Sequence, residues 1–194
     1  MKKILLFITI LTFGISSVNA QDSNFYLGVG AGYATAGGDE YFVDEVKGGI
    51  ALNFINMGYR FNETWGVTAN LASAGHAYED YDAAVGIGTF SVGPMYSFPA
   101  GNMTWDLKPQ IIVSMSGVLK GDDVGDDVED LEWKGSGFII GNSLVMDGGQ
   151  GFTWSIDFDY VMGNFDEVEG DGGSADIDAD YNSLRIGVGV RYNF

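Results

Sequence analysis

Three aspartates at a spacing of two, Asp176, Asp178 and Asp180, most closely resemble part of a metal site. Carboxylate oxygens are the ligands that Ca²⁺ prefers, and an Asp-x-Asp-x-Asp run opens the calcium loop of an EF-hand. That loop next requires a glycine and, later, a closing glutamate, but Tyr181 and Gly187 occupy these positions. The pattern therefore excludes an EF-hand and leaves the three aspartates as weak candidates for binding divalent cations.

The single histidine, His76, is the main candidate for acid–base chemistry. A Ser–His–acid site needs a serine within reach of the histidine. The nearest one, Ser73, precedes it by three residues, and that spacing puts the two on opposite faces of a strand. We therefore expect neither an enzyme active site nor a bound cofactor.

Acidic residues dominate the charge of this chain and are unevenly placed. The formal net charge is −18 at pH 7, from 27 acidic and 9 basic residues. Such a chain is not expected to bind nucleic acid, which attracts positive charge. Most of the acids fall in four segments, which the sequence predicts to be long loops: 37–48, 77–82, 121–132 and 165–180.

Alternation of apolar and polar residues predicts the elements that these acidic segments join. Successive side chains of a strand point to opposite faces, so alternation indicates a sheet with one apolar and one polar face. The alternation breaks near Phe54-Ile55 and near Thr89-Phe90, where a β-bulge would restore it. Eight segments alternate in this way: 25–36, 49–61, 65–76, 84–98, 104–119, 133–145, 152–164 and 184–194.

The last segment carries the most specific signal. From Leu184 to Phe194 every even position is apolar, and Val190, Tyr192 and Phe194 end the run. This closely resembles the C-terminal strand of bacterial outer-membrane β-barrels, in which the last strand is also the signal read by the barrel assembly machinery. The eight segments, joined by alternately short and long connections, resemble the small barrels that include OmpX and the barrel of OmpA.

This resemblance implies an all-β fold, an eight-stranded antiparallel up-and-down transmembrane β-barrel. It also implies a location in the bacterial outer membrane, with periplasmic termini and extracellular long loops. Residues 1–20 have the basic start, short apolar run and small-residue end of a signal peptide. We therefore expect a signal peptide at 1–20 and a barrel domain at 21–194. Expected partners are outer-membrane lipid, lipopolysaccharide and the assembly machinery, with divalent cations at the acidic loops.

The inward faces of the strands predict the contents of the barrel. An eight-stranded barrel is just wide enough for its side chains to fill, and opposite charges confined there should pair. We expect Asp157 and Asp159 to face Arg185 and Arg191 on the neighbouring strand. A soluble lipocalin would point apolar side chains into its barrel. It is disfavoured here because the inward faces contain Gly, Ser, Thr, Asn and charged residues. The charged side chains expected inside are Arg60, Asp106, Lys108, Asp157, Asp159, Arg185 and Arg191.

These observations favour a non-enzymatic barrel with a charge-plugged interior, acidic loops and a structural or surface-interaction role. The alternative is a small passive pore for ions or minor solutes, because a broken ion pair would open a water column. An outer-membrane lipid-modifying enzyme is a remote alternative.

Overall fold

The computed structural model describes residues 24–39, 46, 48–77, 83–121, 132–170 and 173–194. The predicted signal peptide and most residues of the first three predicted loops lie outside this part of the chain. Among the described residues, no helix is long and apolar enough to cross a membrane.

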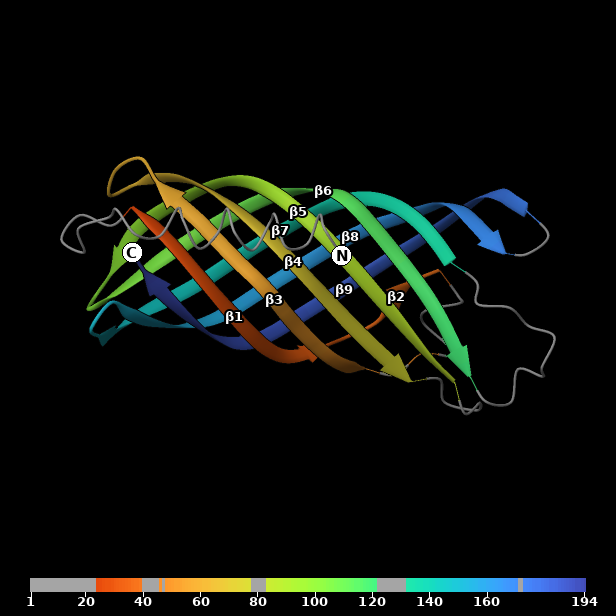
Figure 1. Ribbon diagram of the computed structural model, residues 1–194, viewed down its shortest axis with the longest axis horizontal. Coiled ribbons are helices and arrows are strands. Elements are labelled where there is room, and N and C mark those ends of the chain that lie inside the picture. Colours follow the sequence, from red (N-terminus) through yellow and green to blue (C-terminus); the bar gives the residue numbers. More distant parts are fainter. Residues whose placement is uncertain (1–23, 40–45, 47, 78–82, 122–131, 171–172) are drawn as a thin grey trace, which may run out of the picture.

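Eight long antiparallel strands close into a barrel (Figure 1). Each long strand pairs with the next one along the chain, and β1 pairs with β9 to complete the cylinder. The two-residue strand β2 adds to β9 beyond the end of β1. The predicted eight-stranded up-and-down barrel is confirmed. The strands are β1 (Phe25–Ala34), β2 (Gly37–Gly38), β3 (Gly49–Arg60), β4 (Trp65–Ala77), β5 (Ala83–Ala100), β6 (Met103–Gly121), β7 (Glu132–Gly149), β8 (Phe152–Gly170) and β9 (Gly173–Asn193).

Apolar side chains cover the outside of the barrel, and aromatic rings gather at the end with short connections. The rings of Trp65 and Tyr96 lie 4.8 Å apart between centroids, and those of Phe152 and Tyr192 lie 5.0 Å apart. Phe194 contacts both Tyr192 and Phe25. Aromatic side chains at this level form the girdle typical of a membrane interface.

One of the two predicted bulges is present and the other is misplaced. In β3 the pairing with β4 skips Phe54, so Phe54 and Ile55 both lie on the outer face. The break expected at Thr89-Phe90 is wrong, because β5 pairs with β4 without interruption. The shift next to it lies in β6, where Val113 is the extra residue. The sequence suggested a break because the inward positions of β5 are apolar near its N-terminal end, although the phase of the strand does not change.

The fourth predicted long loop, 165–180, is also wrong. β8 continues to Gly170 and β9 begins at Gly173, so this segment is mostly a hairpin that extends the sheet. Its alternation continues, with Ile177 and Ala179 half-buried between the exposed Asp176, Asp178 and Asp180. The long connection is therefore replaced by backbone pairing between the two strands.

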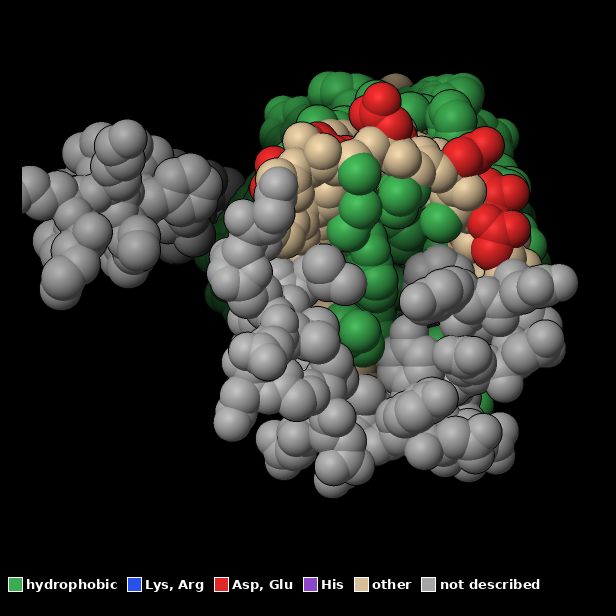
Figure 2. Space-filling model, turned by 90° about the vertical axis from the view of Figure 1, so that its right-hand side faces the viewer, with side chains coloured by type: hydrophobic (Ala, Val, Ile, Leu, Met, Phe, Trp, Pro, Cys, Tyr) green, Lys and Arg blue, Asp and Glu red, His purple; other side chains and the backbone are tan. Residues whose placement is uncertain are grey.

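The interior consists of a polar layer and an apolar layer. Buried polar side chains fill the end near the short connections, and a cluster of buried hydrophobic residues fills the other end. Viewed from the end with the long connections, hydrophobic side chains are visible within the mouth, and Asp and Glu side chains lie along part of its rim (Figure 2). The expectation of a uniformly polar interior is therefore wrong for this half of the barrel. The buried members of the apolar layer are Val46, Val85, Ile87, Ile112, Met115, Ile139, Val161, Phe165 and Tyr181.

Candidate functional site in the barrel interior

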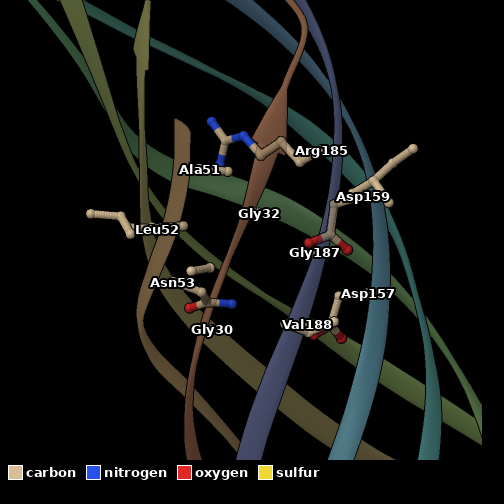
Figure 3. Close-up of a pocket in the computed structure, with 13 residues that line it drawn as sticks. Gly30, Gly32, Ala51, Leu52, Asn53, Asp157, Asp159, Arg185, Gly187 and Val188 are labelled. Carbon is tan, nitrogen blue, oxygen red and sulfur yellow. The ribbon is translucent and has the colours of Figure 1, made fainter. Parts of the chain in front are cut away.

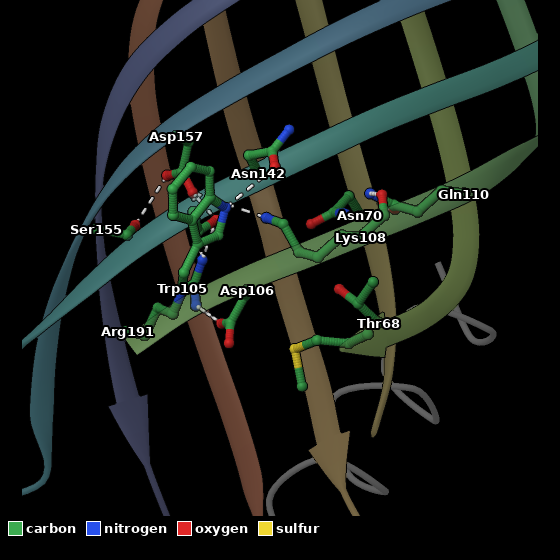
Figure 4. A network of polar contacts seen from close by, with 12 residues as sticks. Thr68, Asn70, Trp105, Asp106, Lys108, Gln110, Asn142, Ser155, Asp157 and Arg191 are labelled. Atoms are coloured by element: carbon green, nitrogen blue, oxygen red, sulfur yellow. Dashed lines mark hydrogen bonds and ion pairs between the residues drawn. The ribbon is translucent and has the colours of Figure 1, made fainter. Parts of the chain in front are cut away.

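Asp106 on β6 is the centre of a charged cluster that crosses the interior (Figure 4). It is fully buried and accepts hydrogen bonds from Arg60, Arg191 and Ser97. Nη2 of Arg60 lies 3.0 Å from both carboxylate oxygens, and Nη1 of Arg191 lies 3.0 Å from Oδ2. Arg60 is on β3 and Arg191 is on β9, the two strands that flank β1. Since β6 lies opposite β1 in the strand order, these bonds tie the two sides of the barrel together.

Asp157 on β8 is the second anion of this cluster. Lys108 Nζ lies 3.7 Å and Arg191 Nη2 lies 3.3 Å from its Oδ1. Ser155 donates a hydrogen bond of 2.8 Å to Oδ2, and Ser143 donates one to Oδ1. Arg191 therefore bridges Asp106 and Asp157 at an exposure of only 2%. Buried charges are tolerated when they are paired and hydrogen-bonded in this way.

Neutral side chains complete this polar layer. The Tyr26 ring lies under both Arg60 and Arg191, whose guanidinium carbons are 5.6 and 4.8 Å from the ring centroid. Farther from the short connections, Gln110 Oε1 accepts hydrogen bonds from Asn70, at 2.6 Å, and from Ser91, at 2.9 Å. The layer thus consists of the ion-paired cluster and a neighbouring group of neutral side chains, which are linked where Gln110 Nε2 donates to the backbone oxygen of Lys108 at 3.5 Å.

Asp159 and Arg185 lie next to this network but are poorly paired. They are direct cross-strand partners and line one cavity of about 40 Å³, together with Asn53 and small residues of the wall (Figure 3). Arg185 is 6% exposed and donates to Thr89 Oγ1 at 3.3 Å. Within the described residues, Nε and Nη2 of Arg185 and Oδ1 of Asp159 have no hydrogen-bond partner. A cavity of this size has room for about three water molecules, which these atoms could bind.

The apolar layer begins beyond Arg185. Val85, Ile87 and Val161 are fully buried in it. The buried His76 and Tyr181 belong to the same level, with 3.0 Å between Nε2 and the hydroxyl oxygen. On β4 the even-numbered residues face inward, so Ser73 lies on the opposite face from His76. The residues at this level therefore form no Ser73–His76 pair of the kind a hydrolase needs.

All seven charged residues predicted to face inward are inside, but their partners differ from those expected. Asp157 pairs with Arg191, as expected, and also with Lys108. Asp159 and Arg185 form no ion pair within 4.0 Å among the described residues. Sequence reasoning missed the central position of Asp106 and the role of Tyr26. The alternation of β1 could have shown that Tyr26 faces inward. It could not have shown that Tyr26 lies at the same height in the barrel as Arg60 and Arg191.

The other predicted site residues lie away from this network. Val190 and Tyr192 are on the outer face of β9, and Phe194 follows that strand directly. Asp178 and Asp180 each accept a hydrogen bond from Asn164 Nδ2, at 2.8 and 3.2 Å. No group of three or more potential metal ligands occurs among the described residues.

Comparison with known proteins agrees with this architecture. No family model matches the chain, and no curated protein matches its sequence. Among solved structures, Neisserial surface protein A is similar with a TM-score of 0.61 at 15% identity, over 89% of this chain and 98% of that one. Ail, the attachment invasion locus protein of Yersinia pestis, is similar with a TM-score of 0.52 at 18% identity, over 88% and 100%. A major outer membrane protein from Thermus thermophilus has a TM-score of 0.55 at 13% identity, over 90% and 100%. The chain therefore has the fold of small outer-membrane β-barrels.

Proposed function

We propose that this protein is a non-enzymatic barrel of the bacterial outer membrane whose interior is closed. In this proposal the termini and short connections face the periplasm, and the long connections are extracellular. The observation that carries it is the pair of aspartates, Asp106 and Asp157, which cations on β3, β6 and β9 hold across the lumen. These ion pairs would act as a plug because separating them exposes unpaired charges in a confined space.

The apolar layer provides a second barrier in the same interior. Ions cross a narrow pore only with part of their hydration shell, and a hydrophobic constriction excludes the water they need. Val85, Ile87 and Val161 are fully buried at this level. A barrel with an ion-paired layer at one end and an apolar layer at the other is expected to conduct no ions in its resting state.

The extracellular end of the barrel, which carries the long connections, would then perform the structural or surface-interaction role. The β8–β9 hairpin extends the sheet there, with Asp176, Asp178 and Asp180 on its outer face. Lipopolysaccharide, approached through bridging divalent cations, is the partner that these carboxylates suit best. Tyr192 and Phe194 at the opposite end would present the assembly signal to the barrel assembly machinery.

A small passive pore is the second candidate function, and one observation favours it. The cavity beside Asp159 and Arg185 has a mainly apolar wall, but both of these charged side chains line it and each has buried polar atoms without a hydrogen-bond partner among the described residues. Hydration of these groups would start a water column in the middle of the barrel. Such a column would need both layers to open before ions could cross.

Single-channel recording in a planar bilayer separates these functions. The refolded wild type should be silent, and so should Asp157→Ala, because the apolar layer remains. Ile87→Asn alone should also be silent, because the ion-paired layer remains. Asp157→Ala combined with Ile87→Asn should produce openings, while Asp157→Ala combined with Val188→Ala on the outer face should remain silent. Reproducible discrete openings of the wild type, altered by Asp157→Ala or Arg185→Ala, would reject the closed barrel in favour of the pore.

A lipid-modifying activity remains the remote alternative. Its candidate base, His76, is buried against Tyr181, and Ser73 lies on the other face of β4. Lipid A deacylation by the wild type that disappears in His76→Ala would contradict the non-enzymatic proposal.

A further inference from the structure

The end of the barrel with short connections contains a second, larger cavity. We call it the vestibule; its volume is about 380 Å³, and its lining includes Arg60, Glu63, Thr104, Asp147 and Arg191. Small-molecule sites in proteins commonly measure about 300–1,000 Å³. The vestibule is therefore large enough for a small solute, whereas the cavity beside Arg185 is not.

The floor of the vestibule presents two guanidinium groups whose hydrogen-bond donors are not all used. Arg60 binds Asp106, and Arg191 binds both Asp106 and Asp157. Nη2 of Arg60 makes both of its contacts with Asp106, and the side chain is 24% exposed toward the cavity. Nε of Arg191 is buried and has no hydrogen-bond partner in the described structure. A guanidinium group has five N–H donors, so both arginines keep donors for another acceptor.

The two guanidinium groups are held in place before any ligand arrives. The Tyr26 ring lies 5.6 Å from the guanidinium carbon of Arg60 and 4.8 Å from that of Arg191. The Tyr26 hydroxyl is itself placed 3.3 Å from Thr68 Oγ1 and 3.7 Å from Met95 Sδ. Groups that are already ordered lose less conformational entropy on binding, which strengthens affinity.

We propose that the vestibule binds the oxyanion group of a small solute, a carboxylate or a phosphate, between Arg60 and Arg191. The planar fork of an arginine matches the two oxygens of either group. Glu63 and Asp147 also line the cavity. Their charges repel a second anionic group, so the preferred solute has one oxyanion and a neutral or cationic remainder, as an amino acid has. Binding at this site does not depend on the orientation of the barrel in the membrane. The side of entry does: in the orientation proposed above, the solute enters from the periplasm.

The chain offers a clean spectroscopic test because it contains three arginines, Arg60, Arg185 and Arg191. Nitrogen-15 spectra of the refolded protein would show three Nε–H signals, with Arg185 outside the vestibule as an internal reference. Sodium phosphate, sodium acetate and glycine would be titrated separately, with sodium chloride keeping the ionic strength constant. The signals of Arg60 and Arg191 should shift and saturate, while that of Arg185 stays fixed. Glycine binding tighter than acetate would identify the zwitterion as the better ligand.

Matched variants distinguish binding from general screening. Arg60→Gln should weaken binding about tenfold or more, the effect of losing a hydrogen bond to a charged group. Glu63→Gln should strengthen phosphate binding, and Lys134→Gln at the opposite end should leave it unchanged. If Arg60→Gln fails to refold, Thr104→Asp tests the same site, because a new carboxylate in the vestibule should weaken binding. Equal, non-saturating shifts of all three arginines, or no shifts, would overturn the proposal.

Discussion

Replacing Asp106 with asparagine removes one charge from the centre of the polar layer with little change in volume. Asp106 is fully buried and is the shared partner of Arg60 and Arg191. Breaking a buried ion pair by removing one partner costs about 3–5 kcal/mol, because the remaining charge stays buried. Asparagine keeps one acceptor oxygen, so we expect a loss near the lower limit, about 3 kcal/mol. The measurement is a urea unfolding titration in detergent, in which the heat-dependent gel shift reports the folded fraction at each urea concentration.

Two further variants determine whether buried charge is the cause. Glu63→Gln removes an exposed carboxylate at the same end and should change the unfolding free energy by less than about 0.5 kcal/mol. Arg60→Gln should cost about 1 kcal/mol, because its side chain is partly exposed and solvent screens the pair. A loss below about 1 kcal/mol in Asp106→Asn, or a loss equal to that of Glu63→Gln, would refute the reasoning.

Two other predictions concern the outer wall and one turn. Ile156 has the same parity on β8 as the exposed Trp154 and Phe158 and so lies on the outer face. Ile156→Arg should cost about 2–4 kcal/mol if this position lies at the bilayer midplane; an unchanged refolding titration would contradict this outward assignment. Gln150→Gly should gain about 0.5–1 kcal/mol, because Gln150 has a φ of 55° that favours glycine. Gln150→Ala is its control, since alanine keeps the strain, and equal stability of the two variants would exclude strain as the cause.

Alternation in the sequence predicted the strands and the side of the wall on which most residues lie. It predicted the inward positions of Asp106 and Arg191 because a side chain's face depends only on local parity. It did not predict that these two residues meet, because height in the barrel depends on the stagger of strands far apart in sequence. Bulges such as the one at Phe54 alter that stagger by a residue each.

The apolar layer was missed for a related reason. The phase break was expected near Thr89-Phe90 because the interior was assumed to be polar along its whole length, whereas Val85 and Ile87 are apolar and face inward. The unbroken pairing of β4 with β5 shows that the phase is continuous and that the interior changes in character instead. A run in which apolar residues change face can therefore indicate either a bulge or a second layer, and local alternation does not distinguish them.

The height of the β8–β9 hairpin has a consequence for how neighbouring molecules meet. β9 pairs with β1 and then with β2 as far as Tyr181 and Gly38, and Asp39 bonds to Asp180 just beyond. Among the described residues, the strand above Asp180 has a backbone partner only on its β8 side. An exposed strand edge is a template for pairing with another chain, and charged side chains are a common protection against it. Asp176 and Asp178 are exposed on this strand, and their charges would disfavour pairing between the raised edges of two barrels without any metal being bound.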